Sequence, residues 1–189
     1  SVFKTFTIAA GIYEKEIEPS TEFRDLPKNI TCAGRPIREY DNKIPSDLTA
    51  EEILIRSGNI GSVRVAQKIG IEKFKSFLDR IGILNKIEFD IEEVGQPISF
   101  RWGKCKLATA SFGRGIATTP LQLARAYAIL GNGGYKIQPF ILKDDIKSIN
   151  TQEQIVSTET SNVINSMLRK VVSLDEGTAN FANIEGYEV

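Results

Sequence analysis

The chain opens with Ser-Val-Phe-Lys-Thr-Phe-Thr over residues 1–7, and this stretch continues into an apolar segment that ends near Tyr13. Its apolar side chains fall on several sides of a helix rather than on one stripe, which is typical of a helix buried on all faces. We therefore predict a buried helix over residues 1–13. Ser1 and Lys4 are three positions apart, so this helix brings a hydroxyl and an amine to one face.

A buried Lys4 beside Ser1 predicts acyl-transfer chemistry. Burial penalises the charged ammonium and lowers the lysine pKa, so the neutral amine can take the serine proton. The backbone N–H groups at a helix start also favour a developing oxyanion. A Ser-x-x-Lys match arises by chance about once in a chain of this size, so an ordinary pair of helix residues is the alternative.

The composition narrows the chemistry further. The chain has no histidine, which excludes a Ser-His-Asp or Cys-His centre and a His-ligated zinc site. Its 189 residues suit one ordinary soluble domain, and 24 basic residues balance 24 acidic ones. No net charge draws the chain to nucleic acid, so we expect no nucleic-acid partner.

The two ends of the sequence and its hydropathy bear on membrane attachment. No apolar run approaches the ~20 residues that a membrane helix needs. The chain begins inside an expected helix and stops at Val189 without a tail, so we expect both ends to be truncated. Any membrane anchor is then expected outside residues 1–189.

The two cysteines, Cys32 and Cys105, are far apart in the sequence and form no Cys-x-x-Cys pair. This arrangement disfavours a metal ribbon or a thioredoxin-type redox motif. We expect two thiols, and the sequence leaves a disulfide open. Cysteine usage therefore does not fix the cellular compartment.

The remainder of the chain is expected to be mostly helical with long connections. Residues 14–46 hold prolines and charges without a period, which predicts a long loop with short strands at best, and residues 88–105 are expected to be irregular. Residues 135–142 are strand-like, although Pro139 restricts them to an edge. Caps predict helices that begin after Thr49, which forms a capping box with Glu52, at Pro120 after Thr119, and from Ser157 or Thr158. Apolar periodicity predicts two more helices, one over residues 60–69 before Gly70 and one that includes Phe74 and Ile81 before Gly82.

A second candidate element is Ser57-Gly58-Asn59, at the break between two expected helices. A tight turn there could project a hydroxyl and an amide into a cleft. The alternative is a plain capping turn, because Ser, Gly and Asn are favoured at helix caps. Ser148-Ile149-Asn150 has the same spacing, so spacing does not choose between the two.

Four blocks of sequence follow one another in a distinctive order. They are Ser-Val-Phe-Lys-Thr-Phe-Thr at 1–7, Arg-Ser-Gly-Asn-Ile-Gly at 56–61, Ser-Phe-Gly-Arg-Gly-Ile at 111–116, and Thr-Pro-Leu-Gln-Leu-Ala-Arg-Ala-Tyr at 119–127 with Asn-Gly-Gly at 132–134. Together they resemble the transpeptidase domain of class B penicillin-binding proteins over nearly the whole chain. Val94-Gly95-Gln96-Pro97 and Arg101-Trp102-Gly103-Lys104 further resemble the cell-division type from alphaproteobacteria.

The resemblance implies an α+β fold, of the penicillin-binding protein and beta-lactamase kind, in which helices flank a sheet. The family's third motif, Lys-Thr-Gly or Lys-Ser-Gly, is absent from the sequence. Glu176-Gly177-Thr178-Ala179 carries glutamate where that motif requires a cation. We therefore expect residues 1–189 to be a partial domain, mainly the helical part, that ends just before the third-motif strand, exposes apolar surface and has little activity alone.

The resemblance also assigns the site. Ser1 is expected to be the acylated nucleophile, Lys4 its base, and Ser57 a proton relay near the leaving group, while Asn59 holds Lys4 and the substrate amide. The implied substrates are the D-alanyl-D-alanine end of a peptidoglycan stem peptide and the amine of a neighbouring stem. Beta-lactams are expected to acylate the same serine. No metal or organic cofactor is expected.

The resemblance places the protein at the periplasmic face of the bacterial inner membrane, with a septal glycan-polymerising complex as its partner. With water as acceptor, the same centre would make a D,D-carboxypeptidase or a beta-lactamase. A catalytically inactive penicillin-binding scaffold or sensor is a further alternative. An N-terminal-nucleophile hydrolase is disfavoured, because the chain lacks the alternating strands of that class.

Overall fold

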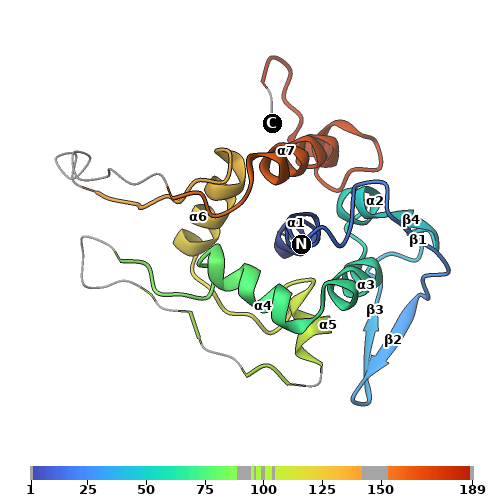
Figure 1. Ribbon diagram of the computed structural model, residues 1–189. Coiled ribbons are helices and arrows are strands. Elements are labelled where there is room, and N and C mark those ends of the chain that lie inside the picture. Colours follow the sequence, from blue (N-terminus) through green and yellow to red (C-terminus); the bar gives the residue numbers. More distant parts are fainter. Residues whose placement is uncertain are drawn as a thin grey trace.

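Helix α1 (Phe3–Tyr13) lies at the centre of the helical body in the computed structural model, and other helices surround it (Figure 1). The structure describes residues 2–88, 95, 97–98, 101–103, 105–141 and 153–187. Every residue from Phe3 to Gly11 is buried, which confirms the predicted buried helix. The helices packed on α1 are α2 (Ala50–Ile55), α3 (Asn59–Ile69), α4 (Ile71–Arg80) and α7 (Thr158–Ser173).

Three of the helices begin at caps that the sequence itself supplies. Thr49 and Glu52 form a reciprocal capping box at the start of α2, and Thr119 and Gln122 form another at α6 (Pro120–Gly131). The Ser157 hydroxyl accepts a hydrogen bond from the Thr160 N–H at the start of α7. These side chains satisfy backbone donors that have no partner within the helix, and the three predicted helix starts are confirmed.

The connection between α3 and α4 also follows the prediction. Gly70 has φ of +82°, a backbone conformation that glycine adopts at little cost, and it separates the two helices. Phe74, Phe77 and Leu78 of α4 are buried on one face. The sequence pattern did not predict α5 (Lys106–Ala110) or the short 3-10 helix η2 (Asn180–Ala182).

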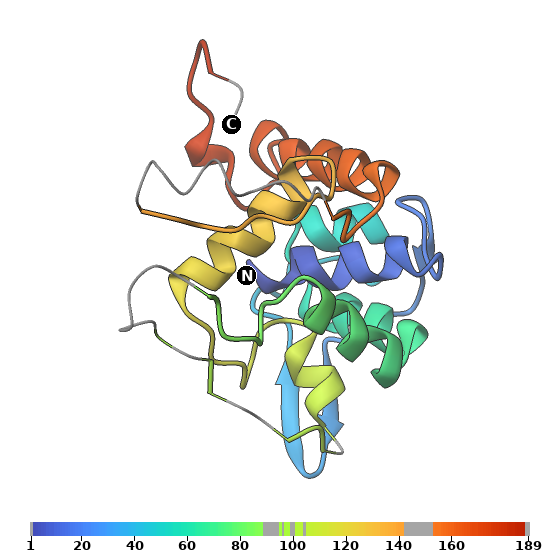
Figure 2. The same cartoon turned by 60° about the vertical axis from the view of Figure 1, so that its left-hand side comes forward.

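Strands are few and short among the described residues, as expected from the prolines of residues 14–46. β1 (Glu22–Phe23) pairs with β4 (Leu48–Thr49), and β2 (Asn29–Cys32) pairs with β3 (Arg35–Arg38), both antiparallel. The β2–β3 hairpin projects from the helical body beside α3 (Figures 1 and 2). The predicted fold, a mainly helical part of an α+β domain, is consistent with this arrangement.

The predicted strand over residues 135–142 is wrong in its described part, residues 135–141. Tyr135 forms one isolated antiparallel bridge with Gln154, and no strand follows. The Lys136 N–H donates to the Glu153 carbonyl and the Ile155 N–H to the Gly134 carbonyl, each at 2.8 Å, while the Tyr135 N–H donates to the Asn132 side chain at 2.9 Å. Pro139 has no N–H to give to a ladder.

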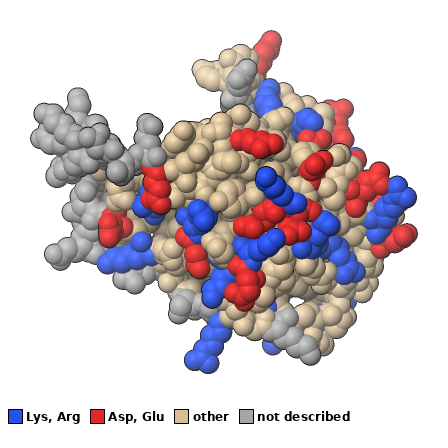
Figure 3. Space-filling view, in the orientation of Figure 1, with Lys and Arg blue, Asp and Glu red and all other residues tan. Residues whose placement is uncertain are grey.

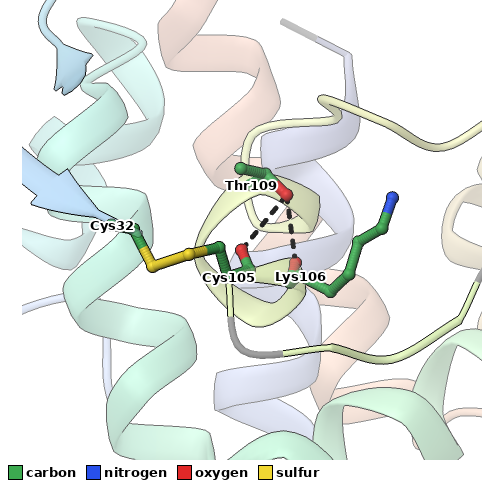
Figure 4. Close-up of a disulfide and its surroundings, with 4 residues drawn as sticks. All are labelled: Cys32, Cys105, Lys106 and Thr109. Carbon is green, nitrogen blue, oxygen red and sulfur yellow. Dashed lines mark hydrogen bonds between the residues drawn. A yellow bond between two sulfur atoms is a disulfide. The ribbon is translucent and has the colours of Figure 1, made fainter. Parts of the chain in front are cut away.

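The expectation of two thiols is also wrong, because Cys32 and Cys105 form a disulfide with a Cα–Cα distance of 5.8 Å (Figure 4). Cys32 ends β2 and Cys105 precedes α5, whose first turn is further held by the Thr109 hydroxyl on the Cys105 carbonyl at 3.2 Å. The chain fold brings the hairpin tip to the start of α5, and sequence distance carries no information about this contact.

The surface mixes charges of both signs. Acidic and basic side chains are interleaved over the face shown in Figure 3, so that face carries no large patch of one sign. Large apolar side chains are exposed near the C-terminal end of the described chain, at Phe181, Ile184 and Tyr187. Over the described ranges, no helix has the length and apolar character to cross a membrane.

Candidate active site

The site is built around Lys4, whose side chain is only 2% exposed although it carries an amine. Its Nζ donates to the Ser57 hydroxyl at 2.8 Å and also to the Ser57 carbonyl oxygen. A buried lysine amine needs hydrogen-bond partners, because desolvation without them is costly. Ser57 supplies two such partners from a segment 53 positions away.

Burial lowers the pKa of the Lys4 amine from 10.5 to about 8, while the nearby negative charge of Glu39 opposes this shift. A base works best when its pKa lies near the working pH, since it is then neutral often enough to accept a proton and basic enough to hold it. Lys4 therefore has the electrostatic properties that its predicted role requires.

Ser57 occupies the tight turn between α2 and α3. Its φ is +55°, which is uncommon for a residue with a side chain and is found more often at functional sites. The turn is held by the Gly58 N–H, which donates to the Ile53 carbonyl at 2.9 Å. Helices α2 and α3 approach so closely here that a Cβ on Gly61 would lie 2.5 Å from the Ile53 side chain. This contact accounts for the glycine in the Arg-Ser-Gly-Asn-Ile-Gly block.

Asn59 is the first residue of α3, and its side-chain amide donates to the Arg38 carbonyl at 2.8 Å. The resemblance led us to expect Asn59 to hold Lys4. Among the described residues it is Ser57 that bonds the Lys4 amine, and Asn59 is tied to the β2–β3 hairpin instead. Asn59 nevertheless lines the same cleft as Lys4, so its amide can face a substrate.

Lys4, Ser57 and Asn59 line one cleft of about 730 Å³. Tyr40 lines it too, with its ring centre 5.9 Å from Lys4 Nζ and its hydroxyl on the Arg56 carbonyl at 3.0 Å. The segment after α7 forms the opposite wall, and Glu176 and Thr178 belong to it.

That opposite wall is attached to the end of α2 at two points. The Thr178 N–H donates to the Ile55 carbonyl at 3.2 Å. Glu176 lies 3.5 Å from the Arg56 guanidinium. Glu176-Gly177-Thr178 does not match the third motif, because it carries glutamate in place of a cation. The segment nevertheless borders the cleft.

Helix α6 supports the start of α1. The Tyr127 hydroxyl lies 2.7 Å from the Val2 carbonyl and 2.9 Å from the Thr5 hydroxyl. Tyr127 ends the fourth sequence block, so that block positions the helix that carries Lys4. Ser1 lies outside the described residues, as do Ser148, Ile149 and Asn150 of the second Ser-x-Asn match.

Sequence reasoning missed two residues of the site, Glu39 and Tyr40, and considered Glu176 only as a substitute for the third motif. Glu39 and Tyr40 lie in the long connection where no periodicity marks a role. Their only signal is position, because they directly follow the second strand of a hairpin. This position indicates a role only once the structure shows that the hairpin packs on α3.

A serine and a desolvated lysine in a cleft define a site suited to acyl transfer without histidine. The sequence matches the penicillin binding protein transpeptidase domain over residues 1–189. The chain belongs to this family, and its relatives place it with the class B members.

Two curated relatives show the level of similarity. The Stage V sporulation protein D of Bacillus subtilis is 31% identical over all of this chain and 31% of its own length. The probable peptidoglycan D,D-transpeptidase FtsI of Caulobacter vibrioides is 26% identical over all of this chain and 32% of its own length. The chain thus spans about a third of these relatives. Because proteins from distant bacteria match it comparably, the alphaproteobacterial subtype stays a prediction.

Solved structures confirm the fold. The transpeptidase domain of Burkholderia pseudomallei penicillin-binding protein 3 superposes with a TM-score of 0.88 and 24% identity, over 99% of this chain and 56% of that chain. A Burkholderia ambifaria peptidoglycan glycosyltransferase structure gives the same TM-score and identity, over 99% of this chain and 59% of that one. The fold predicted from the resemblance is therefore confirmed.

Proposed function

We propose that this chain carries the acylation centre of a peptidoglycan D,D-transpeptidase, which cross-links stem peptides and is a target of beta-lactams. Ser1 is the nucleophile, Lys4 its base, Ser57 a proton relay and Asn59 a donor or acceptor for the substrate amide. The observation that carries the proposal is the buried Lys4 amine, 2.8 Å from the Ser57 hydroxyl in a cleft that Asn59 also lines.

The steps follow from the chemistry of these groups. Neutral Lys4 accepts the Ser1 hydroxyl proton while the serine oxygen attacks the carbonyl of the penultimate D-alanine. The C–N bond breaks, and the proton reaches the leaving D-alanine amine through Ser57, whose hydroxyl can accept one proton and donate another. The amine of a second stem peptide then attacks the ester, returns a proton through the same groups and frees Ser1. A beta-lactam forms the same ester when its ring amide opens.

The wider setting is part of the same proposal. The chain covers about a third of its curated relatives, so the activity of the whole protein, with a third motif and a membrane anchor, belongs to the proposal. The disulfide Cys32–Cys105 supports a location outside the cytoplasm, since disulfides persist in oxidising compartments such as the periplasm. A relative is named the probable peptidoglycan D,D-transpeptidase FtsI, and a role in septal wall synthesis with glycan-polymerising partners belongs to this proposal through the family resemblance.

The test is labelling by a fluorescent penicillin of the full-length gene product and of the 189-residue chain, each with a Ser1→Ala control. Serine-dependent labelling of the full-length protein is expected, with weak or no labelling of the shorter chain. Incubation with stem peptides then distinguishes the acceptor. A cross-linked dimer supports the transpeptidase, release of D-alanine alone indicates a carboxypeptidase, and rapid penicillin hydrolysis indicates a beta-lactamase. Absence of any labelling would leave an inactive scaffold.

A further inference from the structure

Glu39 caps helix α3 from a distance. Its carboxylate accepts the Asn59 N–H at 2.7 Å on one oxygen and the Ile60 N–H at 2.8 Å on the other. Helix α3 has no local cap, because Gly58 stands at its N-cap position. The first N–H groups of a helix lack partners within it, and a carboxylate there also opposes the positive end of the helix dipole. Glu39 thus supplies the hydrogen-bond acceptors that no side chain at the N-cap of α3 provides.

This cap acts on the catalytic turn directly. Asn59 receives a second tie, since its side-chain amide donates to the Arg38 carbonyl at 2.8 Å. Ser57 lies two residues earlier, with its backbone at positive φ and its hydroxyl on Lys4. The direction of α3 and the conformation of the turn are therefore coupled, so movement at Asn59 displaces the Ser57 oxygen from Lys4.

The β2–β3 hairpin that carries Glu39 is itself fixed at its other end. The disulfide links Cys32, near the hairpin tip, to Cys105 at the start of α5 (Figure 4). Helix α5 packs on α3, and so does strand β3, whose Ile37 is buried. The hairpin is thus attached to one end of α3 by a carboxylate and to the neighbour of α3 by a covalent bond.

We propose that Glu39 is a positioning residue of the acylation centre, and that the Cys32–Cys105 disulfide holds the hairpin that presents it. Together they fix the turn that carries Ser57 and Asn59 against Lys4. This inference rests on the acyl-transfer function proposed above. It adds a consequence that the function alone does not contain, namely that the acylation rate depends on the redox state of a disulfide remote from the cleft.

The charge of Glu39 gives the test a signature that a purely structural residue would lack. Among the described residues, Glu39 acts on Lys4 from behind the start of α3, Tyr40 and Glu176 line the same cleft, and Arg56 lies 3.5 Å from Glu176. Glu39 raises the pKa of Lys4 and so opposes the effect of burial. Loss of this negative charge lowers that pKa, and the pH at which acylation reaches half its maximum then falls.

The experiment measures acylation of the full-length gene product by a fluorescent penicillin between pH 6 and 9.5. It resolves the dissociation constant before acylation from the first-order acylation constant, and it records thermal unfolding of the same samples. Glu39→Gln is compared with Glu22→Gln, a matched control whose carboxylate pairs with the exposed Arg24. We expect Glu39→Gln to lower the maximal acylation constant about tenfold, to change the dissociation constant much less, and to lower the pH midpoint.

Further variants separate alignment from folding. Glu39→Asp keeps the charge and both acceptor oxygens, so we expect partial rescue, and it replaces Glu39→Gln if the latter does not fold. Cys32→Ser with Cys105→Ser should also lower the acylation constant. Because the disulfide acts through Glu39, the combined variant should lose less than the product of the two separate effects.

Each result is decisive. An unchanged acylation constant and pH midpoint in Glu39→Gln would overturn the inference and leave the proposed function intact. If the combined variant lost as much of the acylation constant as the product of the two separate losses, the link between Glu39 and the disulfide would be overturned. No serine-dependent labelling of the unsubstituted protein would remove the proposed function, and the inference with it.

Discussion

Helix α6 begins at a cap supplied by its own sequence, whereas helix α3 begins at a cap supplied by a residue 20 positions upstream. In α6, Thr119 and Gln122 bond each other's backbone, and the helix supports the core. In α3, Gly58 leaves the position open and Glu39 occupies it from the hairpin. The start of α6 is thus fixed within its own sequence, while the start of α3, which follows the Ser57 turn and contains Asn59, depends on a tertiary contact. The geometry of the site can therefore be disturbed without unfolding the scaffold.

The largest effect is expected on the site side of this comparison. Lys4→Met places an apolar side chain of similar length in the buried position, so the space stays filled but the base is removed. We expect the acylation constant to fall by about 10²–10⁴-fold, the range typical of a positioned general base, with the protein still folded. Rapid-mixing labelling by fluorescent penicillin measures it, and Lys73→Met, at an exposed ion pair, is the control. Acylation within threefold of the unsubstituted protein would exclude Lys4 as the base.

The disulfide connects the hairpin next to the site with helix α5, since it joins Cys32 to Cys105. Replacement of Cys32 and Cys105 by serine reopens a loop of 73 residues, and chain entropy then predicts a loss of about 4 kcal/mol in the free energy of unfolding. Urea unfolding of the oxidised protein and of the double variant checks this value. Addition of reductant should destabilise the former alone. A loss below about 1 kcal/mol would mean that the hairpin is held without the disulfide.

The pH profile sharpens the description of the site. Lys4 is competent as a base only when neutral, and its pKa is lowered to about 8. The acylation constant should therefore rise with pH, about tenfold per unit well below pH 8, and level off above it. The measurement is the acylation constant at saturating penicillin from pH 6 to 9.5. A profile that is flat from pH 6 to 8 would contradict a lysine base with this pKa.

The smallest effect is expected on the scaffold side. Thr119→Ala removes the cap of α6 and should lower the free energy of unfolding by about 1 kcal/mol. Because this cap is remote from the α2–α3 turn, the acylation constant should stay within twofold. Chemical denaturation and penicillin labelling on the same preparation test both halves. A large loss of acylation without a loss of stability would break the distinction between locally and distantly capped helices.

This distinction also explains how far the sequence could be interpreted. The starts of α2, α6 and α7 are predictable because their signals lie within four residues, and the burial of Lys4 follows from the apolar residues around it on α1. The Cys32–Cys105 bond and the Glu39 cap involve residues that only the fold brings together. The strand expected after Tyr135 is reduced to one bridge, whose hydrogen bonds join Lys136 to Glu153 and Ile155 to Gly134, and Pro139 has no N–H with which to continue a ladder.

The roles of the site residues divide in the same way. Ser57 and Asn59 could be identified as a turn with available polar groups, and the resemblance gave them functions. The sequence could not show that Ser57 bonds Lys4 while Asn59 is tied to Arg38. These partners lie on other elements, and a side chain's choice among them depends on distances that no local pattern encodes.

The central claim is that Ser1 is acylated with Lys4 as its base. The most direct test is mass spectrometry of the full-length gene product after brief exposure to a penicillin at pH 8, with peptide mapping of the adduct. One equivalent of penicillin is predicted on the peptide that contains Ser1, lost in Ser1→Ala and strongly slowed in Lys4→Met. An unmodified protein, or an adduct on another residue that persists in Ser1→Ala, would contradict the account.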